Sequence, residues 1–216
     1  MNIDTLVQTL ERSIGSFLEP LIDRIVAEYG RDPFLILIGC LLSLRAKDTT
    51  TIHICRALFA RARTPHELLA LDVHELETII KRSVYYKNKA RVLRSVCEAL
   101  IERFEGKVPA SYDELVSLWG VGPKTANLVM GMAFGVPSMC VDVHVHRISN
   151  RLGLIQTKTP EQSEEALKAL LPKKWWIAWN KLLVTWGQNI CVPVSPKCSS
   201  CAIADQCKRV GVTRHR

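Results

Sequence analysis

Helix-start signals recur along this chain, and they constrain its fold more than any other feature. Asp72 and Ser111 each precede a helical pattern and are followed three residues later by a glutamate, which is the arrangement of a capping box. Thr64 and Thr159 are each followed by a proline, which loses no hydrogen bond at the first helical position. The signals predict a chain built mainly from helices.

The spacing of apolar residues agrees with these caps. Apolar side chains recur at helical intervals between Leu93 and Ile101. The run 34–42 is shorter than the roughly 18 residues that span a bilayer, so it predicts a buried helix. Asp48 is a candidate cap for the helix that follows it. Only residues 141–146 alternate as a strand would, so we expect an all-α fold of about eight to eleven helices.

The charge balance indicates a polyanionic partner. The 216 residues include 29 Lys and Arg against 21 Asp and Glu, a net charge of +8, and nucleic acid is the first candidate. A hydrophobic content of 48% excludes disorder as a description of the whole chain. The first residues lack the features of a signal peptide, so we expect the protein in the cytoplasm, or in the nucleus of a eukaryote.

Four cysteines near the end of the sequence follow the pattern C-x6-C-x2-C-x5-C. They can enclose one inorganic centre, which would supply the folding free energy that so short a loop lacks. Zinc sites usually contain two closely spaced pairs, whereas iron–sulfur clusters tolerate uneven gaps, so the spacing favours iron–sulfur and leaves zinc open. These four are Cys191, Cys198, Cys201 and Cys207. The isolated cysteines are expected to be buried: Cys40, Cys55, Cys97 and Cys140.

A glycine-rich segment at 118–126 lies between two expected helices. Gly120 and Gly122 permit a tight turn, and the N–H groups at the next helix start can bind a phosphate. Lys124 falls near the second position of that helix, where the positive field of the helix start is expected to favour the neutral, nucleophilic amine. From these residues alone, a surface lysine without a chemical role is the simpler interpretation.

Together these segments resemble the endonuclease III family of DNA glycosylases. The resemblance rests on LxGVGxKTA at 118–126, VDxHVxRxxNRL at 141–152, and the cysteine loop at 191–207, whose spacing matches the family's [4Fe–4S] loop. It implies an all-α, two-lobed helix-hairpin-helix glycosylase fold, with a C-terminal iron–sulfur cluster loop. It also replaces the strand at 141–146 with a loop and a helix start at Asp142, and it decides for [4Fe–4S] over zinc.

The resemblance further implies how the chain is divided. One helical domain, with the helix-hairpin-helix, is expected at 26–136. The second is expected to join 1–25 to 137–216 and to carry the [4Fe–4S] loop. In the family the substrate cleft lies between two such domains, and the protein is expected to act as a monomer.

The chemistry implied is that of a bifunctional DNA glycosylase and AP lyase of base excision repair that removes oxidised pyrimidines from double-stranded DNA. By resemblance, Lys124 is the nucleophile that attacks C1′ of the everted nucleotide and forms a Schiff base, after which β-elimination cuts the strand 3′ to the abasic site. Asp142 is the carboxylate that stabilises the positive charge developing at C1′.

Other residues are expected to contact DNA. By resemblance, backbone N–H groups in the hairpin face a phosphate, and Lys197 in the cysteine loop adds positive charge. Arg45 stands where the family often has Gln, and Tyr85 where it often has Leu, so both are expected near the gap left by the everted base. Trp119 and Val143 also depart from the usual Pro and Thr, which affects lesion preference. The hairpin residues are Gly120, Val121 and Gly122.

Two alternatives stay open at this point. One is a mismatch-specific glycosylase that removes thymine, uracil or adenine. The adenine-specific branch lacks the lysine and carries a Glu in the helix corresponding to 33–44, whereas this chain has Lys124 and no Glu there. The other is a non-catalytic iron–sulfur protein that binds DNA and leaves Lys124 idle.

Overall fold

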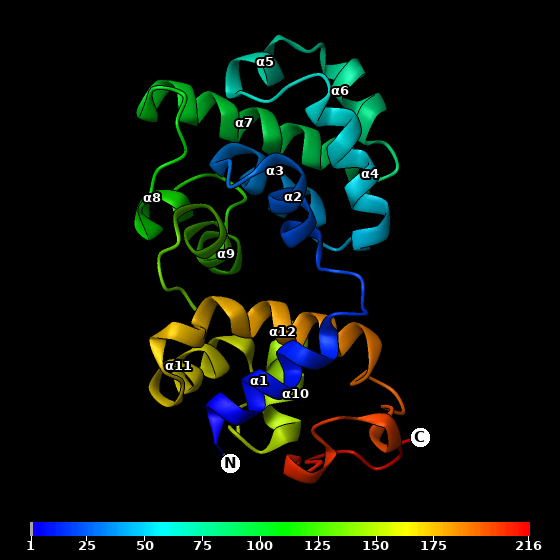
Figure 1. Cartoon of the computed structure of the whole chain (residues 1–216). Coiled ribbons are helices and arrows are strands. Elements are labelled where there is room, and N and C mark those ends of the chain that lie inside the picture. Colours follow the sequence, from blue (N-terminus) through cyan, green and yellow to red (C-terminus); the bar gives the residue numbers. More distant parts are fainter. Residues whose placement is uncertain (1) are drawn as a thin grey trace. The chain divides into compact units, whose positions relative to one another are not determined.

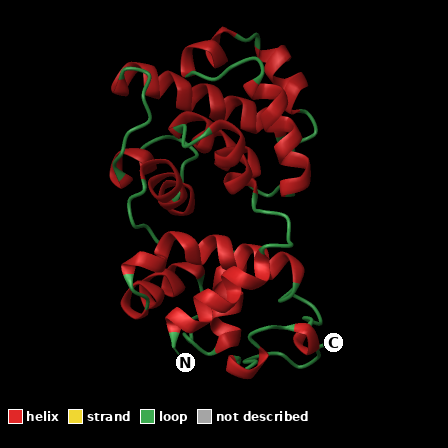
Figure 2. Ribbon diagram, viewed as in Figure 1, coloured by secondary structure: helices red, strands yellow, loops and turns green. Residues whose placement is uncertain are grey.

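The computed structural model describes residues 2–216, which form helices, turns and loops without a strand (Figure 2). This part of the chain contains twelve α-helices, one more than the upper limit expected, and the two shortest are α5 (Pro65–Ala70) and α8 (Tyr112–Val116). None of the described helices is long and apolar enough to cross a membrane. The all-α prediction is confirmed.

The chain separates into two compact units. Unit 1 comprises Met1–Pro20 with Pro137–Arg216, and unit 2 comprises Leu21–Val136. The first boundary therefore lies at residue 20/21, and not at 25/26 as the sequence suggested. A boundary at residue 25 would cut α2 (Leu21–Tyr29), which packs against α3 (Pro33–Ser43) within unit 2.

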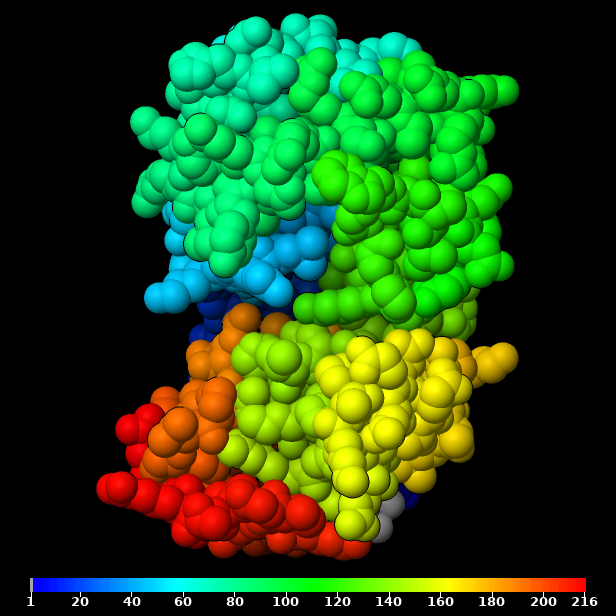
Figure 3. All heavy atoms as spheres, turned by 180° about the vertical axis from the view of Figure 1, so that it is seen from behind, coloured from blue at the N-terminus to red at the C-terminus, as the bar shows by residue number. Residues whose placement is uncertain are grey.

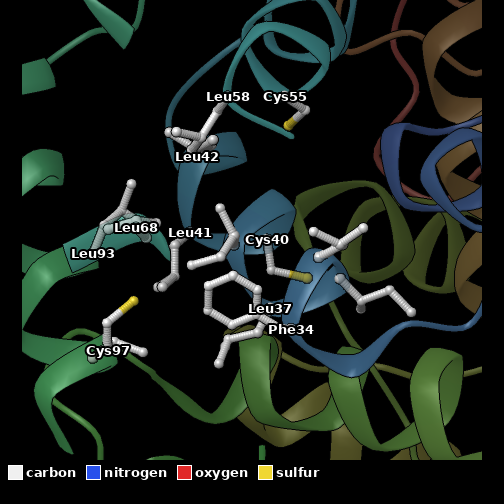
Figure 4. Close-up of a cluster of buried hydrophobic side chains, with 14 of the residues drawn as sticks. Phe34, Leu37, Cys40, Leu41, Leu42, Cys55, Leu58, Leu68, Leu93 and Cys97 are labelled. Carbon is white, nitrogen blue, oxygen red and sulfur yellow. The ribbon is translucent and has the colours of Figure 1, made fainter. Parts of the chain in front are cut away.

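Unit 2 is organised around α3. Every residue from Phe34 to Leu42 is buried, which confirms the prediction of a buried helix. In Figure 4, side chains of α3 meet Leu58, Leu68 and Leu93 from three neighbouring helices. Cys40, Cys55 and Cys97 are buried in the same core, as expected. The remaining helices of unit 2 are α4 (Asp48–Phe59), α6 (Val73–Ile80), α7 (Tyr86–Phe104) and α9 (Pro123–Phe134).

Unit 1 has a separate core, which combines the beginning and the end of the sequence. In this unit α12 (Trp176–Asn189) packs against both α1 (Ile3–Ile14) and α10 (Val143–Leu152) (Figure 1). Trp179 of α12 is fully buried in this core. The rest of unit 1 comprises α11 (Pro160–Leu170) and short 3-10 helices at Lys173–Trp175, Cys198–Ser200 and Ala204–Gln206.

The helix caps largely follow the sequence. Thr64, Asp72, Ser111 and Thr159 each accept a hydrogen bond from a backbone N–H in the first turn of their helices. Asp48 was predicted wrongly: it is the first helical residue of α4, and Lys47 occupies the cap position. Its carboxylate instead accepts from the N–H of Leu21 at 3.2 Å, a contact that fixes the start of α2.

Candidate active site and cysteine loop

The glycine-rich segment forms the turn of a helical hairpin between α8 and α9. Gly120 adopts φ +86°, which L side chains rarely take. A Cβ atom at this position would lie 2.6 Å from Cγ1 of Val92 in α7. Glycine is therefore required twice here, once for the backbone conformation and once for the close approach of α7.

Lys124 is the second residue of α9 and is exposed. Gly122 is the N-cap in an extended conformation, and Pro123 occupies the first helical position. Because the N-cap residue is a glycine, it has no side chain that could accept a hydrogen bond from this helix start. The positive end of the helix is consequently presented together with the lysine, which suits an anionic ligand.

Val121 differs from our expectation for the hairpin. Its N–H donates to the carbonyl of Leu118 at 3.0 Å, and its side chain is buried in the core of unit 2. The prediction that this N–H faces a phosphate is therefore wrong, because the bond that closes the turn already uses it. Gly120 and Gly122 on either side are exposed.

Asp142 is the N-cap of α10, where the strand pattern had been noted. Its Oδ1 accepts from the N–H groups of His144 and Val145, both at 2.9 Å. These bonds orient the half-buried carboxylate at the positive end of a helix whose apolar face is held in the core of unit 1. Val143, which made the sequence alternate, is 66% exposed and belongs to the first turn of α10.

Arg45 and Tyr85 occupy two exposed turns of unit 2. Arg45 follows the end of α3 and has φ 55°, and Tyr85 precedes α7 and has φ 59°. Such left-handed values are uncommon for residues other than glycine and occur mostly at turns and functional sites. The Tyr85 side chain is 62% exposed, so a large aromatic surface is available to a partner.

The four C-terminal cysteines line one cavity of about 30 Å³. Cys191 lies two residues after the end of α12, and Cys198, Cys201 and Cys207 come from the loop with its two 3-10 helices. In the described part of the chain, no group of three or more His, Cys, Asp or Glu side chains is arranged to hold a single metal ion. The structure nevertheless places the four cysteines around one shared space.

Hydrogen-bond donors surround this cavity. Arg151 Nη1 donates to Sγ of Cys191 at 3.4 Å, and the N–H of Arg209 donates to Sγ of Cys207 at 3.4 Å. Trp186 also lines the cavity, and its buried indole N–H meets no acceptor in normal geometry among residues 2–216. Burial raises the pKa of the Cys201 thiol, and the backbone N–H of Ile203 and then the nearby indole of Trp186 partly offset this effect.

The residues after the last cysteine are tied back to the loop. The N–H of Arg216 donates to the carbonyl of Pro196 at 3.0 Å, and the N–H of Ser199 donates to the carbonyl of Arg216 at 3.2 Å. In Figure 3 the C-terminal segment (red) and the preceding loop (orange) share one continuous surface. Lys197, half-buried within this loop, directly precedes the 3-10 helix Cys198–Ser200.

Comparison with known proteins places these features in one family. Residues 38–173 match the model of the HhH-GPD superfamily of base excision DNA repair proteins. The chain is also 42% identical over 196 residues to endonuclease III of Thermotoga maritima, covering 88% of this chain and 92% of that protein. The chain belongs to the endonuclease III family. Membership makes it a bifunctional DNA glycosylase and AP lyase of base excision repair.

Solved structures of the family share this fold. A non-covalent endonuclease III–DNA complex superimposes with a TM-score of 0.84 at 34% identity, covering 96% of this chain and 94% of the other. A trapped covalent endonuclease III–DNA intermediate gives a TM-score of 0.80 at 32% identity, covering 97% of both chains. Both family members are bound to DNA in these structures.

The sequence did not point to three residues whose surroundings in the structure are notable, namely Arg151, Trp186 and Lys89. Arg151 and Trp186 were not connected with the cysteines, because they lie far from most of them in sequence. Lys89 is buried in α7, where its position four residues before Leu93 places it on the apolar face. A lysine in an apolar helical stripe is a signal that could have drawn attention to it.

Proposed function

We propose that this chain removes oxidised pyrimidines from double-stranded DNA and cuts the strand at the abasic site that results. The observation that carries the proposal is the placement of an exposed Lys124 at the start of α9, directly after the hairpin turn. When the helix start binds a phosphate of the DNA backbone, an amine at that position can reach the adjoining sugar.

The proposed reaction begins at C1′ of the everted nucleotide. The amine of Lys124 forms a bond to C1′, the glycosidic bond breaks, and its electron pair leaves with the damaged base. Opening of the sugar ring gives an imine between the lysine and C1′. Loss of a C2′ proton then expels the 3′ phosphate and breaks the C3′–O bond, which is β-elimination. A covalent endonuclease III–DNA intermediate has been trapped for a relative, which supports this course.

Asp142 is proposed to act on the same reaction through its charge. C1′ becomes positive as the base departs, and a carboxylate nearby stabilises that transition state. The two backbone N–H groups that hold Oδ1 fix the orientation of the group before substrate binds. The second carboxylate oxygen, Oδ2, is proposed to face the substrate.

Arg45 and Tyr85 are proposed to stabilise the DNA once the damaged nucleotide has left the stack. Eversion leaves a gap and an unpaired base on the opposite strand. An exposed aromatic ring can stack in such a gap, and a guanidinium can bond to the orphaned base or to a phosphate. Their exposed, left-handed turns support this role. Gly120 and Gly122 would contact a phosphate through the backbone, and Lys197 would add positive charge.

The four cysteines that line the cavity are proposed to hold a [4Fe–4S] cluster. Their side chains enclose one shared space, and the donors around it suit a group rich in sulfur acceptors. When bound, the cluster would supply the cohesion that a loop with few apolar residues cannot provide by itself. Glycosidic cleavage needs no electron transfer, so the proposed role is structural.

Borohydride trapping tests the proposed function. We expect the protein to form a covalent adduct with a duplex containing thymine glycol or an abasic site, and the Lys124→Ala variant to form none. Lys107→Ala, which changes an exposed lysine elsewhere in unit 2, serves as the control and should trap like the unchanged protein. Equal trapping by Lys124→Ala would remove Lys124 from the mechanism, and no adduct with the unchanged protein would reject the Schiff-base reaction.

A further inference from the structure

Lys89 is a charged residue in an unusual place. Among residues 2–216, it is the only Lys, Arg, Asp or Glu that is buried, with 8% of its surface exposed. Its ammonium group donates to the carbonyl of Leu42 at 2.7 Å and to the hydroxyl of Ser83 at 2.8 Å. Burial lowers its pKa, which reflects the cost of keeping a cation there.

Packing alone does not account for this lysine. Both of its acceptors are neutral oxygens, whereas a buried cation is compensated best by a carboxylate. An apolar side chain of similar length would fill the same space without the desolvation cost. A charge that stays buried despite this desolvation cost suggests that its two hydrogen bonds hold the segments of Leu42 and Ser83 in place.

The two acceptors lie at the roots of the two exposed turns described above. Leu42 is in the last turn of α3, three residues before Arg45. Ser83 is two residues before Tyr85, in the segment between α6 and α7. The N–H of Lys89 also donates to the carbonyl of Tyr85 at 3.0 Å. One residue therefore connects two segments that are 41 residues apart in the sequence, as their numbers show.

We propose that Lys89 is a positioning residue that sets the spacing of the Arg45 and Tyr85 turns, so that both side chains enter the DNA at the vacated position. The inference rests on the proposed function of those two residues. Because neither turn is fixed by glycine, the left-handed backbone at each must be held by its surroundings. The ammonium group of Lys89 holds both turns through its hydrogen bonds to Leu42 and Ser83.

The test uses Lys89→Met, which keeps an unbranched apolar chain and removes both hydrogen bonds. A duplex carries a stable abasic analogue opposite 2-aminopurine, whose fluorescence reports stacking of the orphaned base. At saturating protein we expect Lys89→Met to show less than about half of the fluorescence change of the unchanged protein. We expect single-turnover excision of thymine glycol to slow by about tenfold or more, since small misplacements are costly in catalysis. KM should change by less than about threefold, because phosphate contacts dominate affinity.

Two further variants keep the inference falsifiable. Lys107→Met removes an exposed lysine of the same unit and should behave like the unchanged protein in both measurements. Ser83→Ala removes one of the two hydrogen bonds and should give an intermediate fluorescence change; it decides the question if Lys89→Met does not fold. Unchanged fluorescence in a folded Lys89→Met, or in Ser83→Ala when Lys89→Met does not fold, would overturn the inference.

The outcomes separate this inference from the proposed function. If the unchanged protein forms no borohydride adduct, the function fails whatever the Lys89 variants do. If it does form the adduct, and a folded Lys89→Met leaves the fluorescence change unaltered, only the role of Lys89 is lost. Lys89→Arg keeps the charge. If it loses as much of the fluorescence change and of the excision rate as Lys89→Met does, the positioning depends on the shape of the ammonium group as well as on its charge.

Discussion

At the scale of single residues, several groups serve the local structure and the proposed chemistry together. Asp142 caps α10 through one carboxylate oxygen, and the same side chain is the proposed charge stabiliser. The sequence predicted Asp142 only through the family pattern, because alternating Val and His residues resembled a strand. The segment forms a helix because Asp142 caps it and because Val145 and Ile148 of α10 are buried in unit 1.

Replacing the charge of Asp142 while keeping its cap tests its role. Asn is as good an N-cap as Asp, so Asp142→Asn should preserve α10. We expect excision to slow by about 10²–10³-fold, as for loss of a preorganised charge, with DNA affinity changed only slightly. Single-turnover kinetics measure the excision rate, and titration of labelled duplex measures DNA affinity. Asp72→Asn, at the N-cap of α6, is the matched control. Unchanged excision in Asp142→Asn would reject the assignment.

Gly120 offers a test of the hairpin turn. Gly120→Ala adds a Cβ atom where φ is +86° and where Val92 lies 2.6 Å away. We expect a loss of about 1–3 kcal/mol in the free energy of unfolding. Gly122→Ala is the control, because an added Cβ meets no atom within 4 Å and φ is −92° there. Urea unfolding compares the two variants, and an equal effect would show that close packing on α7 is not the cause.

At the scale of elements, the sequence predicted helix starts better than the contacts between helices. Thr64, Ser111 and Thr159 acted as local signals, since the cap and the N–H it receives are three residues apart. Asp48 failed as a cap because its partner, Leu21, lies 27 residues earlier in the sequence. The same limit explains why Lys89 was missed: Leu42 is 47 residues from it, beyond any local pattern.

The cysteine loop is the element whose stability we expect to depend on a bound group. Cys198→Ser should lose most of the iron, where the unchanged protein should contain about four irons per chain. Its thermal unfolding midpoint should also fall, because the loop has little apolar content of its own. Cys97→Ala, in the core of unit 2, should keep its iron. Metal analysis of anaerobically prepared protein measures this, and stoichiometric zinc in place of iron would contradict the proposed cluster.

At the scale of the whole molecule, unit 1 is discontinuous in sequence. Its core joins α1 to α12, so the first helix cannot pack until the end of the chain is available. Contacts of such long sequence separation slow folding. Local patterns did not predict this arrangement: no linker or shift in composition marks residue 20 or residue 137. The division at 26 expected from the family pattern fell inside α2, whose packing on α3 the sequence does not reveal.

Buried thiols should make stability depend on pH in the alkaline range. Burial raises the pKa of Cys55 and of Cys97 from 9.0 to about 12. The folded state therefore keeps both thiols protonated while the unfolded chain ionises them above pH 9. The stability that this supplies is complete below pH 9 and declines as the pH rises from 9 toward 12, by up to about 1.4 kcal/mol per pH unit for each thiol.

Urea unfolding between pH 7 and pH 11 measures this dependence. The double variant Cys55→Ala and Cys97→Ala should be less stable at pH 7 because of the cavities it creates. Its stability should fall less steeply above pH 9 than that of the unchanged protein. Other groups titrate in the same range, so the difference between the two slopes is the quantity that counts. Parallel curves would show that these thiols do not contribute.

The backbone bonds between Arg216 and the cysteine loop have a practical consequence for protein preparation. The N–H and the carbonyl of Arg216 are both engaged with that loop, at Pro196 and Ser199. An affinity tag fused after Arg216 would begin directly beside these bonds and beside the segment that holds the cysteines. Purification handles are therefore better joined ahead of α1, where Asn2 caps the helix from an exposed position.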